Sequence, residues 1–515
     1  MVHLNSFIEQ ITKVNDAVND FVWVKLGLIL LIGTGLLMTI LTKFFQVTHF
    51  GHWMKNTIGS IFKKNVSGHS KEKASISQFQ ALCTALAATV GVGNIAGVAS
   101  AIALGGPGAI LWMWIAAFFG MMTNYSENVL GIFYRRKNSK GEWTGGAMYY
   151  LQDGLGSKKH CKGIGKVLAV IFAVCCLLAS FGIGNLSQCN SIVTNFTGVF
   201  KNDYLSSIKL GGSNLYVFLV GCVVMIVAAL VIIGGIKRIA SVTEKIVPFM
   251  IIVYVVGSLI IIGTNYSNII PAFGAIFKFA FGAEAVAGGF AGIVIKDVVT
   301  WGFKRGVFSN EAGLGSSVMV HSASNVREPV RQGMWGIFEV FADTIVVCTM
   351  TALVILTSGL VDLSTGAMNT TAEKTVLVSE AFSNRFGAVG GGFVAIAILL
   401  FAFSTILGWS YYGSKAWEYL FGTKSMIIYK VVFVIVIAAG TLLSSSLAWD
   451  ISDTFNGMMM LPNLVGVITL SGVVMKITAN YVDRTFKHKN VKPMLSYDEE
   501  INNEQHSKIK ADRKA

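Results

Sequence analysis

Residues 81–104 form an apolar run that is long enough to cross a lipid bilayer, but the sequence GVGNIAG interrupts it near its middle, at residues 91–97. Lipid offers no water to the backbone, so a spanning helix must satisfy its own amide and carbonyl groups. Glycine in a helix interior costs roughly 1 kcal/mol relative to alanine. Three glycines at this depth therefore predict a break in the helix, where free backbone groups can hold a small zwitterion and a cation.

The composition predicts a membrane protein. Apolar residues make up 53% of the 515 residues and charged residues only 13%, whereas a soluble domain carries about 25% charged residues. The formal net charge is +14. The basic residues lie in short loops between apolar runs, which favours contact with the headgroups of a lipid bilayer over binding of nucleic acid. The seven cysteines indicate neither a disulfide framework nor a zinc site.

Eleven apolar runs have the length of roughly 20 residues that a spanning helix needs. They cover residues 21–43, 79–104, 108–134, 167–196, 215–236, 246–264, 273–303, 332–358, 388–412, 425–443 and 455–475. The sequence thus predicts an all-α membrane protein with about eleven transmembrane helices. Its regions are an N-terminal segment with an extra span and a basic loop (1–78), a membrane core (79–475) and a tail (476–515), whose mixed charges indicate disorder.

Basic residues are concentrated in every second loop. The loops at 43–73, 135–166, 235–245, 304–331 and 413–424 and the tail are basic, whereas the loops at 105–107, 201–213, 265–272, 359–385 and 448–454 are poor in lysine and arginine. Loops rich in lysine and arginine stay in the cytoplasm. We therefore expect a multi-pass plasma-membrane protein with its N-terminus outside and its C-terminus in the cytoplasm.

A second glycine-rich interruption, GGFAG, lies at residues 288–292 within the run 273–303. If the run 79–104 is counted as the first core span, this run is the sixth, and it crosses the membrane in the opposite direction. Two interrupted helices at corresponding positions of two inverted halves are the best sequence indication of a transporter site. The residues expected to face the first break are Gly288, Gly289, Phe290 and Gly292.

Four motifs together resemble those of a known family. They are GVGNIAG at 91–97, NLSQ at 185–188, FSNEAGLGS at 308–316 and GWSYYG at 408–413. From about residue 79 to 475 the chain resembles the prokaryotic alanine or glycine:cation symporters, the sodium:alanine symporter family, which is similar in fold to the neurotransmitter:sodium symporters. The resemblance implies a five-plus-five inverted repeat with two broken helices, preceded by one extra span. It also implies import of alanine or glycine by alternating access, with Na⁺ as coupling ion and no organic cofactor.

The first break is expected to bind the substrate, because amides at a half-helix N-terminus attract a carboxylate. Asn94 adds an amide oxygen for Na⁺ or for the substrate amine. Close helix packing through the GxxxG face is the alternative, and a dinucleotide loop lacks its strand–turn–helix context. The amides at 185 and 188 bind substrate or a neighbouring helix, and the indole at 409 either limits side-chain size or packs. The expected substrate residues outside 288–292 are Thr89, Gly91, Gly93, Asn94, Asn185, Gln188 and Trp409.

A sodium site follows from the resemblance. The similar transporters hold Na⁺ with two carbonyls of the first core helix, one carbonyl of the eighth, and a Ser/Thr pair in the eighth. The matching groups here are the carbonyls of Ala87, Val90 and Phe401 and the hydroxyls of Ser404 and Thr405. The alternative is a pair of hydroxyls bonded to the preceding turn of their own helix.

Carboxylates inside apolar runs are costly and are often functional. Those of this chain are Glu127, Glu284, Asp297, Glu339 and Asp343. Glu127 lies two turns before Arg135, which predicts a cytoplasmic gate pair, and Glu284 is the residue that we most expect to act in coupling.

Other function classes find less support in the sequence. The loop at 309–317 lacks the GxxxxGK[ST] pattern of a phosphate cradle, so we expect no ATP. An intramembrane enzyme would need a set such as HExxH or paired aspartates, and neither occurs. A proton-coupled amino-acid carrier of different selectivity and a channel stay open as alternatives.

Overall fold

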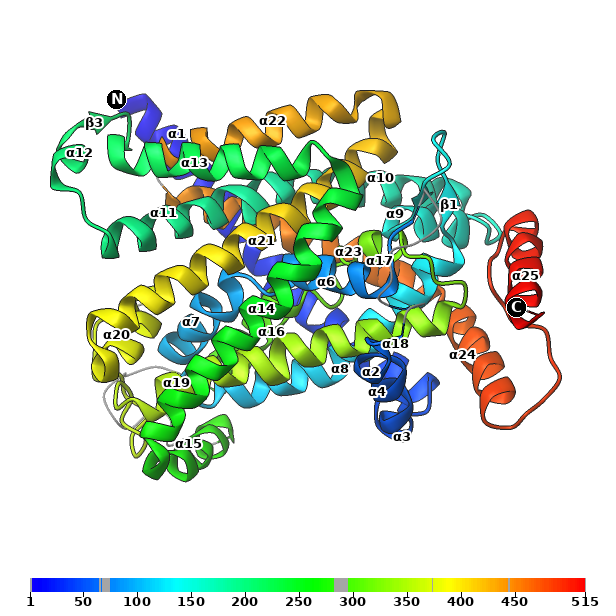
Figure 1. Ribbon diagram of the computed structural model, residues 1–515, viewed down its shortest axis with the longest axis horizontal. Helices are drawn as coiled ribbons and strands as arrows, with labels where there is room; N and C mark the ends of the chain where they lie inside the picture. Colours follow the sequence, from blue (N-terminus) through cyan, green and yellow to red (C-terminus); the bar gives the residue numbers. More distant parts are fainter. Residues whose placement is uncertain are drawn as a thin grey trace.

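Most long helices of the computed structural model run from one end of the molecule to the other (Figure 1). The structure describes residues 2–63, 66, 75–281, 295–372, 374–442 and 445–514. The second predicted break, with Gly288, Gly289, Phe290 and Gly292, lies outside the described residues, as does Glu284.

The N-terminal half holds the first interrupted span. Short 3₁₀ or π segments are labelled η. The elements are α1 (Val2–Asn19), η1 (Asp20–Gly27), α2 (Leu28–Leu41), α3 (Phe45–Thr48), α4 (Phe50–Asn56), η2 (Ile58–Ser60), α6 (Gln78–Thr89), η3 (Val92–Asn94), α7 (Ala96–Gly105), α8 (Ala109–Phe133), β1 (Arg136–Lys137), β2 (Trp143–Thr144), α9 (Ala147–Tyr149), η4 (Tyr150–Leu155), α10 (Lys162–Phe181), η5 (Gly182–Leu186) and α11 (Ser187–Val199).

The remaining elements are mostly helices as well. They are α12 (Asp203–Ser207), β3 (Lys209–Leu210), β4 (Ser213–Asn214), α13 (Leu215–Ile232), α14 (Gly235–Thr264), η6 (Tyr266–Asn268), α15 (Ile269–Phe281), α16 (Ile295–Asn310), α17 (Val318–His321), α18 (Pro329–Val340), η8 (Phe341–Cys348), α19 (Thr349–Thr357), α20 (Lys374–Phe386), α21 (Ala388–Phe421), η9 (Thr423–Ser425), α22 (Met426–Ala439), η10 (Gly440–Leu442), α23 (Ser445–Thr469), α24 (Ser471–Thr485) and α25 (Glu499–Lys514). The two strand pairs are antiparallel hairpins of two residues a side.

In the described part of the chain each of the eleven predicted apolar runs overlaps with helices, but the number of spans is not confirmed. Among the described residues, seven helices are long and apolar enough to cross a membrane, and two bent pairs raise the number to nine. The run 108–134 is α8, which is 25 residues long. The run 273–303 consists of α15 and α16, with residues outside the described part between them.

The predicted break in the first core span is confirmed. A reciprocal capping box starts α6, with the Gln80 amide donating to Ser77 Oγ (3.1 Å) and the Ser77 amide to Gln80 Oε1 (3.0 Å). The helix ends at Thr89, and α7 continues at an angle of 60° to α6. The backbone between them is extended at Gly91, so the ladder of helical hydrogen bonds is interrupted inside the protein.

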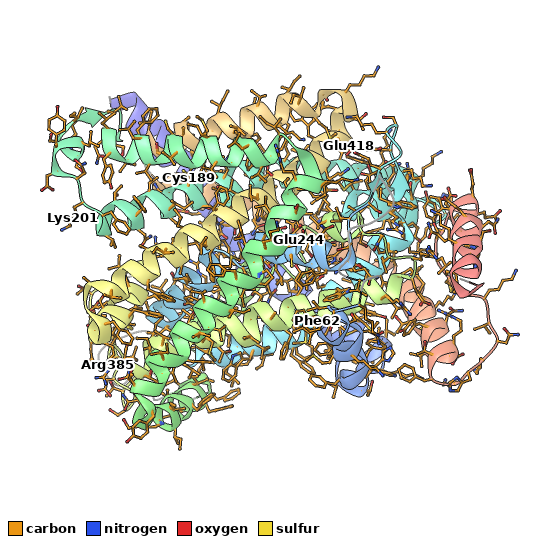
Figure 2. All side chains as sticks on the ribbon, in the orientation of Figure 1. Phe62, Cys189, Lys201, Glu244, Arg385 and Glu418 are labelled. Carbon is orange, nitrogen blue, oxygen red and sulfur yellow. The ribbon has the colours of Figure 1, made fainter. Side chains whose placement is uncertain are left out.

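The loops divide between two ends of the molecule as the charge pattern predicts. The β1–β2 hairpin, α24 and α25 lie at one end, whereas α12, α15 and α20 lie at the other, and the two termini are at opposite ends (Figure 1). Figure 2 shows Lys201 and Arg385 at the end that holds α12 and α20, and Glu418 at the end that holds β1. Which end faces the cytoplasm stays a prediction.

The C-terminal tail forms helices, although its composition indicated disorder. The segment between α24 and α25 anchors it to the end of α8: the Tyr497 amide donates to the carbonyl of Phe133 (3.1 Å), and Leu495 is buried. Lys137 of β1 pairs with Glu504 of α25 (2.8 Å), and this hydrogen bond holds the pKa of Glu504 below its usual value. A few anchoring residues therefore order a charged segment that has no apolar periodicity.

Small residues allow α8 and α18 to pack closely. A Cβ atom added at Gly333 of α18 would lie 2.7 Å from Cδ2 of Tyr125, whereas one added at Gly392 of α21 would have no neighbour within 4 Å.

This difference gives a matched test of the helix packing. Gly392→Ala should raise the free energy of unfolding by up to roughly 1 kcal/mol, because alanine is the better helix former. Gly333→Ala should lower it by about 1–3 kcal/mol, because the methyl group overpacks against Tyr125. Thermal unfolding of the purified protein in detergent measures both changes. Equal shifts in the two variants would contradict the packing described.

Candidate binding site at the helix break

Asn94 holds the broken segment in place with both ends of its amide. The amide N–H of Gly91 donates to Asn94 Oδ1 (2.9 Å), and Asn94 Nδ2 donates to Oδ1 of Asp343 (2.6 Å). Asn94 is completely buried. In this conformation its amide oxygen, which we expected to bind Na⁺ or the substrate amine, accepts from the backbone of the break instead.

Asp343 of η8 brings a carboxyl group into direct contact with Asn94 of the break. Its carboxylate accepts hydrogen bonds from Asn94, from Ser309 Oγ (2.8 Å) and from Thr344 Oγ1 (2.8 Å), and all three donors are neutral. The side chain is fully buried. A buried carboxylate is costly unless a positive charge or a proton accompanies it. This corner of the site is therefore suited to a cation, an ammonium group or a proton.

The structure brings together most of the predicted sodium ligands. Thr405 Oγ1 of α21 lies 3.1 Å from the carbonyl oxygen of Ala87 in α6 and 3.0 Å from that of Phe401. Val90, the fifth predicted ligand, is buried in the turn that follows α6. Oxygen atoms from two helices thus converge beside the break, which is the donor chemistry that transporters use for Na⁺.

Ser404 occupies a different position from its neighbour. Its hydroxyl donates to the carbonyl of Phe401 (2.8 Å), and its nearest partner on another helix is Met250 Sδ at 3.5 Å. Both hydroxyls donate to the carbonyl of Phe401 in the preceding turn of α21, as the alternative to a sodium site predicts for this Ser/Thr pair. Only Thr405 also reaches α6.

Gly91 lies so close to α21 and α11 that no side chain fits on this face. A Cβ atom added there would lie 2.4 Å from Thr405 Oγ1 and 3.6 Å from Gln188 Oε1. The absence of a side chain lets the backbone approach the two polar groups directly. The break, the hydroxyl and the glutamine amide therefore meet at one point.

The two predicted amides of α10–η5–α11 differ in what they contact. Gln188 Nε2 donates to the carbonyl of Ile183 (3.0 Å), and Asn185 Nδ2 donates to the carbonyl of Phe433 on α22 (2.8 Å). Within the described part of the chain, Gln188 Oε1 and Asn185 Oδ1 are buried without a hydrogen-bond partner. A buried acceptor left unpaired costs about 1–3 kcal/mol. Gln188 Oε1 faces the break, whereas Asn185 bridges to a neighbouring helix.

Trp409 is fixed by a carboxylate that the sequence analysis did not single out. Its indole Nε1 donates to Glu311 Oε1 (2.9 Å), and Glu311 also accepts from Ser316 Oγ. The indole is buried against Gly184, where an added Cβ would lie 2.3 Å from Trp409 Cβ. Glu311 belongs to the FSNEAGLGS motif, which was the available signal.

The other predicted residues near the break make local contacts. Thr89 Oγ1 bonds the carbonyl of Ala85 in its own helix (3.3 Å). An added Cβ at Gly93 would lie 3.3 Å from the ring of Phe308. The structure therefore places Gly93 beside α16, the half-helix that follows the second predicted break.

Glu127 and Arg135 have partners other than each other. Glu127 accepts from Asn463 Nδ2 of α23, whereas Arg135 donates to the carbonyls of Ser322 and Ser324. The predicted gate pair is therefore not formed in this conformation, and a gating role for Glu127 stays a prediction.

The sequence analysis did not predict that Glu339, one of the carboxylates in the apolar runs, pairs with a buried histidine. His321 Nε2 lies 3.0 Å from Glu339 Oε2, and both side chains are fully buried. The histidine lies in a segment that the apolar runs assigned to a loop, so no sequence pattern connected it to Glu339.

Comparison with known proteins identifies relatives along nearly the whole chain. A family model described as the sodium:alanine symporter family matches residues 8–495. The chain is 45% identical to sodium/alanine symporter AgcS of Methanococcus maripaludis, over 90% of this chain and 95% of that protein. It is 34% identical to the "Probable sodium/glutamine symporter GlnT" of Bacillus subtilis, over 90% of this chain and 89% of that protein.

Comparison with solved structures supports the fold. The crystal structure of MhsT in complex with L-phenylalanine matches 79% of this chain and 99% of its own, with a TM-score of 0.53 and 12% sequence identity. At this identity the likeness shows the fold alone. It supports the predicted all-α fold.

Two glycines of the break allow a matched test of the site. Gly91→Ala should displace Thr405 Oγ1, because the new Cβ atom would lie 2.4 Å from it, whereas Gly97→Ala meets its nearest atom, Arg305 Cδ, only at 3.9 Å. A ligand that binds the folded state raises its stability. We expect Na⁺ to raise the unfolding temperature of the wild type and of Gly97→Ala, but not of Gly91→Ala. If Na⁺ raised the unfolding temperature of Gly91→Ala as much as that of the wild type, the break would not be part of the cation site.

Proposed function

The chain belongs to the sodium:alanine symporter family, and from this we propose that it imports a small neutral amino acid, alanine or glycine, with Na⁺ by alternating access. The family and its relatives support Na⁺-coupled amino-acid transport through a membrane. Relatives differ in substrate, since one is named for alanine and another for glutamine. The choice of alanine or glycine is therefore the proposal, as is the direction of transport.

The observation that carries the proposal is the meeting of Thr405, Ala87 and Phe401 directly beside Gly91. In this arrangement the hydroxyl of Thr405 and the two carbonyls hold Na⁺, with the carbonyl of Val90 as a further candidate, whereas Ser404 faces Met250 and takes no part. The same segment of backbone offers its amides to the substrate carboxylate. Sodium binding fixes the geometry of the break, and a fixed break binds the carboxylate, so the two ligands stabilise one conformation.

Two side chains define the rest of the substrate site in this proposal. Gln188 Oε1 lies beside the break and accepts no hydrogen bond from the described residues, so in this proposal it accepts one from the substrate ammonium. Trp409, held by Glu311, closes the space for the side chain and so favours small amino acids. Burying one more methylene changes the free energy of substrate binding by only about 0.8 kcal/mol. Selection of small substrates therefore depends on the indole of Trp409 blocking the space that a larger side chain needs.

Proton coupling is the second candidate, and Asp343 is the observation that favours it. Among the described residues its buried carboxylate has only neutral donors, and it contacts the break through Asn94. A proton on this group would serve the same role as a bound cation. We propose no enzymatic activity, because the family and its relatives are transporters.

Binding of radiolabelled alanine to the purified protein tests the proposed substrate and ion. We expect binding in sodium chloride and little binding in choline chloride at the same ionic strength. Unlabelled glycine should compete, and valine and glutamine should compete several-fold less well. Alanine binding that is equal in both salts and changes only with pH would reject Na⁺ in favour of the proton-coupled candidate.

Single substitutions in α21 test the ion site. Thr405→Ala should raise the sodium concentration for half-maximal alanine binding about tenfold, because losing one ligand of about 1.4 kcal/mol has that effect. Ser404→Ala removes a hydroxyl of the same size that faces Met250, so we expect a change of less than about threefold, or 0.6 kcal/mol. If the two variants shifted the sodium dependence equally, the distinction drawn from the structure would fail.

A further inference from the structure

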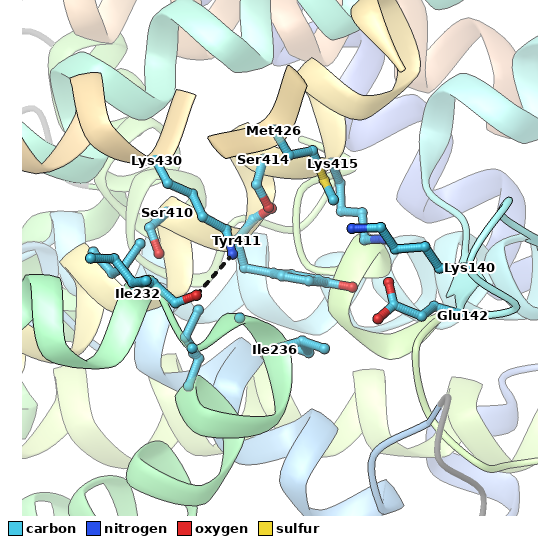
Figure 3. Close-up of a pocket in the computed structure, with 14 residues that line it drawn as sticks. Lys140, Glu142, Ile232, Ile236, Ser410, Tyr411, Ser414, Lys415, Met426 and Lys430 are labelled. Atoms are coloured by element: carbon cyan, nitrogen blue, oxygen red, sulfur yellow. Dashed lines mark hydrogen bonds between the residues drawn. The ribbon is translucent and has the colours of Figure 1, made fainter. Parts of the chain in front are cut away.

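A cavity of about 200 Å³ lies at the end of the molecule that carries the basic loops, and it shares no residue with the site at the break (Figure 3). Its walls come from the β1–β2 hairpin, the junction of α13 and α14, the end of α21 and the start of α22. Three loops that the charge pattern predicts to be cytoplasmic thus meet here. We call this cavity the hairpin pocket.

The hairpin pocket contains two lysines that lack a carboxylate partner among the described residues. Lys430 of α22 is half-buried, and its ammonium group makes one long hydrogen bond of 3.5 Å to the carbonyl of Ile233. Lys140 reaches in from the hairpin. By contrast, Lys415 is paired with Glu418 at 2.7 Å. A half-buried ammonium with so little compensation favours an anion as its partner.

Tyr411 supplies a buried donor to the same pocket. Its side chain is 4% exposed, and its hydroxyl has no hydrogen-bond partner in the part of the chain that the structure describes. Figure 3 shows the ring crossing the pocket with its hydroxyl toward Lys140 and Glu142. An unpaired buried hydroxyl is costly, and an anionic oxygen would satisfy it.

One carboxylate, Glu142, also lines the pocket, but the lysines keep the pocket positively charged. Glu142 accepts a hydrogen bond from Asn138 Nδ2 at 3.3 Å, and Asn138 also donates to Glu418. Among the described residues of the pocket, the two lysines without a carboxylate partner outnumber this single glutamate, and the Lys415–Glu418 pair is neutral as a unit. The pocket is therefore suited to an anion that carries donors of its own for Glu142, such as hydroxyl groups.

The surroundings of the pocket are apolar and exposed. Ile233, which lines it, is 57% exposed, and the adjoining faces of α13 and α22 expose Leu230, Ile427, Ile428 and Val431. Exposed apolar faces on membrane helices are the surfaces that acyl chains cover, and basic pockets beside them on the cytoplasmic side bind lipid headgroups. The opening thus lies where a headgroup can enter while its chains stay outside.

We propose that the hairpin pocket binds the phosphate-bearing headgroup of an anionic phospholipid, with Lys430, Lys140 and the hydroxyl of Tyr411 as donors. The volume suits a phosphate that carries a small polyol, and the lipid chains lie along α13 and α22. A free phosphate offers the same anionic oxygens but gains nothing from the apolar faces.

Native mass spectrometry of the full, delipidated chain in detergent tests this proposal. We expect added phosphatidylglycerol to bind to the wild type, and added phosphatidylcholine to bind at least fivefold less. The double substitution Lys430→Gln with Lys140→Gln should lower phosphatidylglycerol occupancy at least fivefold. Lys424→Gln, an exposed lysine at the same end but outside the pocket, should leave it unchanged. Equal occupancy in the double and control variants would overturn the proposal.

Two conservative variants show whether a loss of lipid binding comes from the missing donor group or from misfolding. Tyr411→Phe removes only the hydroxyl oxygen and should lower occupancy by two- to fivefold, while Lys430→Arg keeps the charge and should retain most of it. Unchanged binding in Tyr411→Phe together with full loss in Lys430→Arg would contradict the assigned donors.

Inorganic phosphate separates the two sources of the anion. Phosphatidylglycerol should raise the unfolding temperature of the wild type and not that of the double variant, whereas millimolar inorganic phosphate should raise neither. Equal stabilisation of the wild type by inorganic phosphate would overturn the lipid assignment.

Discussion

The break between α6 and α7 exposes backbone amides and carbonyls in a part of the protein where lipid offers them no partner. Asn94 satisfies one of these groups, the amide of Gly91, and ties the broken segment to Asp343. Thr405 satisfies another, the carbonyl of Ala87. Three elements meet at this segment: α21 and α11 approach Gly91, which has no side chain, and η8 is joined to the break through Asn94. A ligand that binds to the other backbone amides and carbonyls of the break would stabilise this arrangement.

This arrangement explains how an ion and a substrate can depend on each other without touching a common side chain. Within the first core span the proposed cation ligands end at Val90, and the proposed carboxylate site begins at Gly91, so Na⁺ and substrate act on one short stretch of backbone. A ligand can shift a conformational equilibrium only by its difference in affinity for the two states. If Na⁺ orders the break, it lowers the cost of ordering that the substrate would otherwise meet, which is positive coupling. Asp343 is joined to the same backbone through Asn94, so in the proton-coupled alternative a proton on this carboxyl would act on the same equilibrium.

The local features of this fold were predictable from the sequence, and the long-range contacts were not. Glycines at 91, 93 and 97 signal a break, and the length of apolar runs signals helices, because both depend on neighbouring residues. The bond between Asn94 and Asp343 joins residues 249 apart, and nothing in the sequence pairs them. Ser404 and Thr405 look equivalent in sequence, but a step of one helical residue turns a side chain by about 100°, so only one of them faces α6. The sequence did not indicate the buried contacts of Glu311 and His321, because the segment that contains both was assigned to a loop, whereas the structure buries both side chains.

The most direct test of sodium coupling is uptake of radiolabelled alanine into proteoliposomes that contain only this protein. With an inward sodium gradient and no proton gradient or membrane potential, alanine should accumulate above its external concentration. The accumulation should collapse when the sodium gradient is dissipated. Accumulation driven by a proton gradient in the absence of sodium, with none under the sodium gradient, would contradict the account.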